Sequence, residues 1–330
     1  MTDATSYSVG AVRAQAGTQA RGYCAVDVGG GELSLPVVVT HGSEPGPVLA
    51  VTAGIHGGEY VPVVAVRQFV RDLDPTRMRG TIVACLLSSP AAFFQRLAFV
   101  NPLDGQNLNR SFPGDPQGEP TARLAAWLRE NLLARADYYV DCHCGDLPEV
   151  LDPFAGVYPG PDGTVSDRCQ AMADCFDVSR IIVSRLQGDT IAAAAAAGVP
   201  AVLVEVGGQG RWSQAEADIQ SDGLRRVAEL AGILPGEAAR SRGASARRRL
   251  PLFEDAADVL CERPGLWFPE IAVGAAVAQG SRLGRLEDAL GAEVQEILAP
   301  VDGVLVYGLG SLAAKQGDLL AFLARPLPGS

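Results

Sequence analysis

From residue 36 onward, short apolar segments alternate with amphipathic ones, and this alternation constrains the fold more than any other feature. Residues 36–42 and 45–58 have the pattern of buried strands bounded by Gly and Pro, and residues 61–74 have the apolar spacing of a helix. Further strands are predicted at 80–89, 137–146, 180–186 and 200–208, and helices at 122–136, 166–177, 190–198 and 213–234. Several of these strands are apolar on both faces, as in a sheet covered by helices. We therefore predict an α/β fold with a largely parallel or mixed central sheet flanked by helices.

The composition changes near residue 236, which suggests a division into domains. Residues 237–249 are small, polar and basic, and we interpret them as a solvated linker rather than a binding patch. Residues 250–330 contain short apolar runs separated by Gly and Asp, typical of a small all-β module. We predict a catalytic domain over residues 1–236, a basic linker over 237–249 and a β-rich C-terminal module over 250–330.

The charge balance excludes some classes of partner. The 330 residues carry a net charge of −11, a field that repels nucleic acid and anionic membrane, so neither is an expected partner. The chain has no apolar segment of roughly 18 residues, and its N-terminus lacks the apolar core of a signal peptide. Its seven cysteines are scattered and odd in number, which fits a reducing compartment. We predict a cytoplasmic protein.

The three histidines are the first candidates for chemistry. His41 has no acidic or cysteine partner at useful spacing and is predicted to be an ordinary turn residue. His56 and Glu59 lie in "GIHGGE", where the glycines allow a sharp turn that can bring both side chains to one metal ion. This spacing alone is a weak signal, and a glycine turn that happens to contain a histidine is the alternative.

His143 supplies a third possible ligand. In "YYVDCHCGD", the two-residue period of a strand places Asp141 and His143 on one face, and Cys142 and Cys144 on the other. Two histidines and one carboxylate, with a fourth position open, form a catalytic rather than a structural zinc site. Asp141 could orient His143 from behind. The cysteines could act as thiolate ligands or a redox pair, but packing beneath the strand is the favoured interpretation.

A hydrolytic zinc site also needs a general base. Glu205 ends the apolar strand segment "PAVLVE", where a carboxylate must be paired, directed at a metal or catalytic. Partial desolvation would raise its pKa, which suits a base that must later return its proton. Pairing with a neighbouring arginine is the alternative.

A polar loop supplies candidates for substrate binding. "DGQNLNRSFPG" contains Asn107, Asn109 and Arg110. Arginine is well suited to binding a carboxylate through two parallel hydrogen bonds, and asparagine can add a third. We predict this role for Asn109 and Arg110, and interpret Asn107 as a turn former.

Four segments occur in the order typical of one family: "GIHGGEY", "NPLDGQNLNRSFPG", "DCHCGDLPE" and "VEVGGQG". In these segments the chain resembles the succinylglutamate desuccinylase and aspartoacylase family, which is related to zinc carboxypeptidases. The resemblance implies a carboxypeptidase-like mixed sheet followed by a barrel-sandwich-like β module. It also implies one zinc ion per chain, bound by His56, Glu59 and His143, with Glu205 activating the zinc-bound water.

The same resemblance implies that Asn109 and Arg110 hold the substrate carboxylate. Many members also have an arginine that stabilises the oxyanion, at the position that Ala98 occupies here. Arg96 lies two residues away and could substitute for it. The C-terminal module resembles biotinyl and lipoyl carriers, but Lys315 lies too late for their modified lysine. We expect the module to shape the active-site entrance or to make an oligomer contact.

Three hypotheses follow. The leading one is a zinc-dependent amidohydrolase, a deacylase that removes an acyl group from an N-acyl amino acid or a similar small carboxylate. The second is a metallocarboxypeptidase acting on a short peptide, which would use the same metal site. The third is a non-catalytic homologue that binds a metal or ligand; the presence of Glu205 argues against it, and Ala98 weakly supports it.

Overall fold

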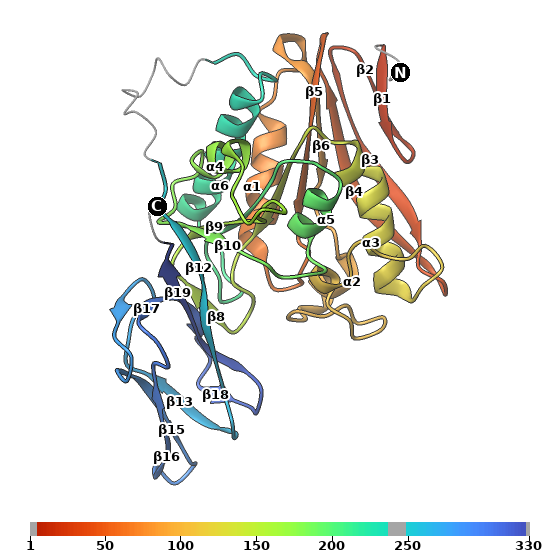
Figure 1. Cartoon of the computed structure of the whole chain (residues 1–330). Coiled ribbons are helices and arrows are strands. Elements are labelled where there is room, and N and C mark those ends of the chain that lie inside the picture. Colours follow the sequence, from red (N-terminus) through yellow and green to blue (C-terminus); the bar gives the residue numbers. More distant parts are fainter. Residues whose placement is uncertain (1–4, 237–248, 328–330) are drawn as a thin grey trace.

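The computed structural model describes residues 5–236 and 249–327 (Figure 1). The predicted linker, residues 237–249, lies outside the described residues except for Arg249. The strands and helices predicted between residues 36 and 234 are all present, so the α/β prediction is confirmed. None of the described helices is long and apolar enough to span a lipid bilayer.

A large mixed sheet passes through the molecule. Its strands from the first part of the chain are β3 (Thr18–Asp27), β4 (Glu32–His41), β5 (Glu44–Ala53), β6 (Arg79–Cys85), β7 (Tyr138–His143), β9 (Phe154–Val157), β10 (Ile181–Val183) and β11 (Ala201–Glu205). They lie side by side in the order β10, β9, β11, β7, β5, β6, β4, β3. β7 pairs in parallel with β5 on one side and β11 on the other. The carboxyl ends of these three strands therefore meet at one edge, where ligands bind in open α/β sheets.

Helices cover both faces of this sheet (Figure 1). On one face lie α1 (Tyr60–Arg71), α4 (Asp167–Ala173) and α6 (Gln214–Leu230), which contribute Phe69, Met172 and Leu224 to one apolar core. On the other lie α3 (Pro120–Asn131), α5 (Thr190–Ala196) and the hairpin β1 (Ser6–Val9) and β2 (Val12–Gln15), which share a second core. α2 (Pro90–Gln95) and 3-10 helices at Pro75–Arg77, Leu108–Arg110 and Leu133–Arg135 lie in the connections.

All of the regular secondary structure in residues 252–326 is β-strand. The strands are β12 (Leu252–Leu260), β13 (Gly265–Pro269), β14 (Ala276–Val277), β15 (Arg282–Glu287), β16 (Glu293–Leu298), β17 (Gly303–Leu309), β18 (Ala313–Ala314) and β19 (Leu319–Pro326). β16, β15, β13 and β18 form a separate antiparallel sheet, which shares an apolar core with β14, β17 and β19.

The central sheet continues into this C-terminal segment. β12 pairs in parallel with β10, and the order then runs through β19 and β17 to β14. A short strand, β8 (Glu149–Leu151), pairs with β17, so residues just after β7 contact the C-terminal segment directly. The β-rich segment is thus joined to the α/β part by backbone hydrogen bonds.

Candidate metal centre and active site

The turn between β5 and α1 carries two of the predicted metal ligands. β5 ends at Ala53 and α1 begins at Tyr60, so His56 and Glu59 lie in the tight connection between them. A Cβ on Gly57 would lie 2.4 Å from the carbonyl oxygens of Ala92 and Leu97. Glycine is required there because the backbone of residues 92–97 lies directly against the turn.

His143 ends β7 and brings the third predicted ligand to the same place. Glu59 lies between the two imidazoles: its Oε1 is 2.6 Å from Nδ1 of His56, and its Oε2 is 2.9 Å from Nδ1 of His143. The donor atoms of the three residues lie within 4.8 Å of one another, and all three side chains are buried in or beside the core. Two imidazole nitrogens and one carboxylate at this separation form a group that could hold a metal ion.

The far nitrogen of each imidazole is held by an oxygen. Nε2 of His143 lies 2.9 Å from Oδ2 of Asp141, and Nε2 of His56 lies 3.0 Å from Oδ1 of Asn107. A proton on Nε2 can then be donated to these oxygens, and a metal ion could take the place of the Nδ1 proton that each ring shares with Glu59. Two imidazoles and a carboxylate in this arrangement fit the ligand set of a catalytic zinc site.

Asp141 is itself fixed by two hydroxyl groups. Thr52 Oγ1 donates to its Oδ1 at 2.6 Å, and Thr190 Oγ1 donates to its Oδ2 at 2.5 Å. Both cysteines of the motif are buried, and Cys142 packs in the core beneath α1 and α6. Burial raises the pKa of Cys142 well above the usual thiol range, so its thiol stays protonated and is a poor metal ligand.

Glu59 remains ionised although it is buried. Burial alone would raise its pKa, but the facing imidazoles of His143 and His56 more than offset this effect and lower the pKa to about 2. The carboxylate is therefore negatively charged at neutral pH, as a metal ligand must be.

Glu205 lies beside His143 on the neighbouring strand. β11 pairs in parallel with β7, and Glu205 is directly opposite His143, so both side chains lie on the same face of the sheet. The Oε2 atom of Glu205 is buried and has no hydrogen-bond partner among the described residues, nor does any described arginine pair with this carboxylate. Burial raises its pKa well above the ordinary value; His143 opposes this shift, and Glu59 and Glu149 add to it.

Asn107 connects the predicted carboxylate-binding loop to the metal group of His56, Glu59 and His143. Asn107 Oδ1 accepts a hydrogen bond from the backbone N–H of Asn109 at 2.8 Å, in addition to its contact with His56. The side-chain Oδ1 of Asn109 accepts from the backbone N–H of Thr190 at 3.1 Å, which leaves its amide N–H groups to donate elsewhere. Arg110 is exposed, and its Nη1 donates to the carbonyl of Asn109 at 2.7 Å. Asn107 is thus both the predicted turn former and a partner of a candidate ligand.

The segment around Ala98 differs from the other predicted site segments. Arg96 is exposed at the end of α2, and its side chain has no hydrogen bond or ion pair with the described residues. Its role in substrate binding stays a prediction. Phe99 instead approaches the site: its backbone N–H donates to Asp146 at 2.7 Å, and its ring lies edge-on to His56 with centroids 6.5 Å apart.

Sequence reasoning did not identify two further groups near the site. Glu149 Oε2 accepts the backbone N–H of Asp146 at 2.8 Å, and its carboxyl is hydrogen-bonded to the hydroxyl of Tyr307 on β17. Burial raises the pKa of Glu149 to about 7. The available signal was weak, since Glu149 is only the last residue of the "DCHCGDLPE" segment.

His41 is not part of this group. It ends β4, which runs antiparallel to β6, and it pairs with Thr81 near the start of β6. Its Nδ1 lies 2.9 Å from the Thr81 hydroxyl, at the opposite edge of the sheet from the ends of β5 and β7.

The chain is similar to known proteins over most of its length. The chain is 28% identical over 304 residues to an N-alpha-acetyl-L-2,4-diaminobutyric acid deacetylase from Halomonas elongata, covering 89% of this chain and 86% of that protein. A solved succinylglutamate desuccinylase/aspartoacylase from Rhodobacter sphaeroides is similar with a TM-score of 0.82 and 25% identity, over 94% of this chain and 96% of the other.

The product-bound structure of the ectoine utilization protein EutE (DoeB) from Ruegeria pomeroyi is similar with a TM-score of 0.81 and 26% identity. The aligned region covers 93% of this chain and 95% of that one. Residues 45–231, more than half of the chain, match the family described as the succinylglutamate desuccinylase/aspartoacylase catalytic domain. The chain belongs to the succinylglutamate desuccinylase/aspartoacylase family.

Proposed function

We propose that this protein is a zinc-dependent amidohydrolase that removes the acyl group from an N-acyl amino acid or a similar small carboxylate. The observation that carries the proposal is the position of Glu205: a buried carboxylate oxygen without a protein partner, directly across from His143 in the sheet. The named activity of the Halomonas elongata relative, a deacetylase of an N-acetylated amino acid, supports the same reaction class.

His56, Glu59 and His143 would hold one zinc ion through their Nδ1 and carboxylate atoms. When bound, zinc supplies Lewis-acid polarisation of the amide carbonyl and lowers the pKa of water. Asp141 and Asn107 would keep the two imidazoles in the required tautomer and orientation.

Side chains of the protein would bind the substrate and transfer the proton. The guanidinium group of Arg110 and the free amide N–H of Asn109 would bind the substrate carboxylate and fix the amide bond beside Glu205. Glu205 would accept a proton from the attacking water as the oxygen of that water bonds to the carbonyl carbon of the substrate. It would then return that proton to the nitrogen as the C–N bond breaks, giving a carboxylic acid and a free amine.

The raised pKa of Glu205 suits both roles. A base with an ordinary carboxyl pKa would hold its proton too weakly to collect it from water, whereas burial strengthens that hold. The unpaired oxygen also argues against the non-catalytic alternative, because a structural carboxylate in a buried position is normally hydrogen-bonded. In this proposal the catalytic groups come from residues 1–236, and residues 250–330 contribute Tyr307 beside Glu149.

A substrate panel tests the proposal. The purified zinc-loaded protein would be assayed with N-acetyl and N-succinyl amino acids, N-alpha-acetyl-2,4-diaminobutyrate and short peptides, with release of free amine as the readout. We expect turnover of at least one N-acyl amino acid, loss of turnover with a chelator and recovery when zinc is added. Faster cleavage of the peptides would favour the carboxypeptidase alternative, and a zinc-loaded protein that cleaves nothing in the panel would contradict the proposal.

A further inference from the structure

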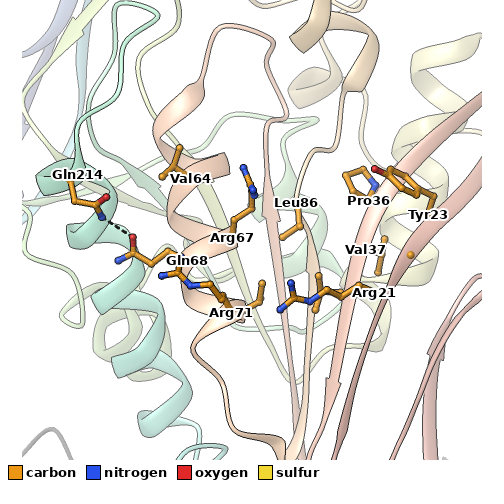
Figure 2. A pocket seen from close by; sticks show the side chains of 13 residues that line it. Arg21, Tyr23, Pro36, Val37, Val64, Arg67, Gln68, Arg71, Leu86 and Gln214 are labelled. Carbon is orange, nitrogen blue, oxygen red and sulfur yellow. Dashed lines mark hydrogen bonds between the residues drawn. The ribbon is translucent and has the colours of Figure 1, made fainter.

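A groove between α1 and β3 lies apart from the metal group (Figure 2). It has a volume of about 480 Å³, within the range of sites that hold small molecules. Arg67 and Arg71 belong to the second half of α1, whereas Glu59 immediately precedes the helix. At a rise of 1.5 Å per residue, Arg67 lies roughly 12 Å along the helix axis from Glu59, the nearest predicted metal ligand in the sequence.

The lining of the groove is positively charged. Three of its 13 lining residues are arginines, Arg21, Arg67 and Arg71, and none is Asp or Glu. The whole chain, by contrast, carries a net charge of −11. Arg67 and Arg71 are four residues apart, so they project from the same side of α1. Figure 2 shows Arg21 reaching toward Arg71 from β3 on the other side of the groove.

Asp72 is the one carboxylate that pairs with any of the three guanidinium groups among the described residues. Arg67 has no hydrogen bond or ion pair with any of them. Arg21 uses its Nε on Gln19 Oε1, at 2.8 Å, and Arg71 uses its Nε on the exposed Asp72, at 3.0 Å. The terminal N–H groups of all three arginines therefore stay available to donate hydrogen bonds to an anion.

The floor and the ends of the groove are ordered. Val38, Val70 and Leu86 supply an apolar floor. Gln19 donates to the carbonyl of Val70 at 2.8 Å, which ties β3 to the last turn of α1. At the other side, Gln214 on α6 donates to Gln68 Oε1 at 2.7 Å (Figure 2). An apolar floor beside three guanidinium groups suits a molecule with an apolar body and a charged end.

We propose that this groove binds a small organic polyanion, a phosphate or polycarboxylate with at least two negative charges, at a site separate from the catalytic centre. The anion would offset the mutual repulsion of Arg21, Arg67 and Arg71, and its apolar part would cover the valine and leucine floor. The proposal does not depend on the proposed hydrolase activity.

The test is calorimetric titration of the full-length zinc-loaded protein in about 0.15 M salt, where weak surface attraction is screened. The probes are inorganic pyrophosphate, citrate and adenosine monophosphate, which distinguish phosphate from carboxylate and measure the effect of an apolar body. We expect at least one probe to bind once per chain outside the catalytic centre. Loss of charge-assisted hydrogen bonds in Arg67→Gln/Arg71→Gln should weaken that binding at least about tenfold.

Two variants locate the binding. Arg168→Gln removes one exposed positive charge from α4, outside the groove, and should leave the affinity within about twofold. Arg110→Gln removes the predicted carboxylate ligand of the catalytic site and should also leave it unchanged. The proposal is overturned if no probe binds, if the double variant binds as well as the wild type, if Arg168→Gln weakens binding equally, or if Arg110→Gln abolishes it.

Discussion

The contacts of two imidazole rings, those of His56 and His143, hold the metal group together. His56 and His143 each place one nitrogen on Glu59 and the other on an oxygen of a different residue, Asn107 or Asp141. Strand alternation predicted that His143 and Asp141 share a face, and the glycine turn predicted that His56 and Glu59 lie together. The contact of Asn107 with His56 could not be predicted, since an asparagine in a loop forms turns whether or not its oxygen also meets a distant side chain.

Asp141→Asn should weaken zinc binding by about 10-fold to 100-fold, because the neutral amide holds the Nε2 proton of His143 less strongly and lowers the basicity of the ligand. Zinc affinity measured by competition with a chromophoric chelator checks this expectation. Asp137→Asn, at the exposed residue just before β7, is the matched control and should keep the wild-type affinity. Equal zinc affinities for Asp141→Asn and wild type would show that Asp141 does not support metal binding by His143.

Arg110→Ala should raise the KM for carboxylate-bearing substrates by about 10-fold to 100-fold, because it removes charge-assisted hydrogen bonds made on binding. Arg263→Ala, which removes another exposed arginine, should change neither KM nor kcat. In the same assay, a lower kcat for Arg96→Ala would support its predicted role near the oxyanion. An unchanged KM for Arg110→Ala would show that the carboxylate binds elsewhere.

The connection from β5 to α1 shows how an element end positions a ligand. Residue 57 must be glycine because a Cβ there would lie 2.4 Å from two backbone carbonyl oxygens, and a Cβ on residue 58 would displace the side chains of Asp146 and Leu147. The sequence predicted β5, α1 and a tight glycine turn, since apolar runs and Gly are strong local signals. It could not predict that residues 92–97 press against that turn, because this contact joins segments separated along the chain.

Gly57→Ala should lower the free energy of unfolding by about 1–3 kcal/mol, because the added methyl group forces the β5–α1 turn away from residues 92–97. The same shift should displace His56 and reduce zinc affinity. Urea unfolding measures the first effect. Gly30→Ala is the control, since a Cβ at that exposed loop residue meets nothing within 4 Å. Equal losses in the two variants would contradict the proposed close packing.

Several elements were not predicted from the sequence. β1, β2 and β3 precede the region where the apolar alternation is clear, and half of the residues of β3 are exposed, so the strand lacks a buried face over its full length. β8, β9 and α2 are only three to six residues long. Such short segments are stabilised by pairing and packing with distant partners rather than by a periodic pattern of their own.

At the scale of the whole molecule, the C-terminal segment extends the central sheet through β12, β19, β17 and β14, while its other strands form a separate sheet. The sequence predicted its all-β character from short apolar runs and turns. It did not predict that β12 pairs with β10 or that β17 pairs with β8, because strand pairing is a long-range property. The second pairing brings Tyr307 to Glu149, near the proposed catalytic groups.

Glu149→Gln should make the protein's stability less dependent on pH. The pKa of Glu149 is raised to about 7, so the folded state holds this proton more tightly than the unfolded chain does. Its contribution to stability is full below the ordinary carboxyl pKa and is lost as pH rises through 7, by up to roughly a few kcal/mol.

Urea unfolding at fixed zinc concentration between pH 5 and 8 measures this dependence. Wild type should lose stability relative to Glu149→Gln over that range, whereas Glu130→Gln, an exposed change on α3, should run parallel to wild type. Parallel curves for wild type and Glu149→Gln would show that this carboxyl does not link stability to pH.

The account depends most on Glu205 as the base beside a metal bound by His56, Glu59 and His143. The direct measurement is zinc content together with kcat for Glu205→Gln and wild type, using the best substrate of the panel. We predict about one zinc per chain in both proteins, as a three-ligand site implies, and a kcat at least about 100-fold lower in the variant. Full turnover by Glu205→Gln, or a wild-type protein that takes up no zinc after reconstitution, would contradict the account.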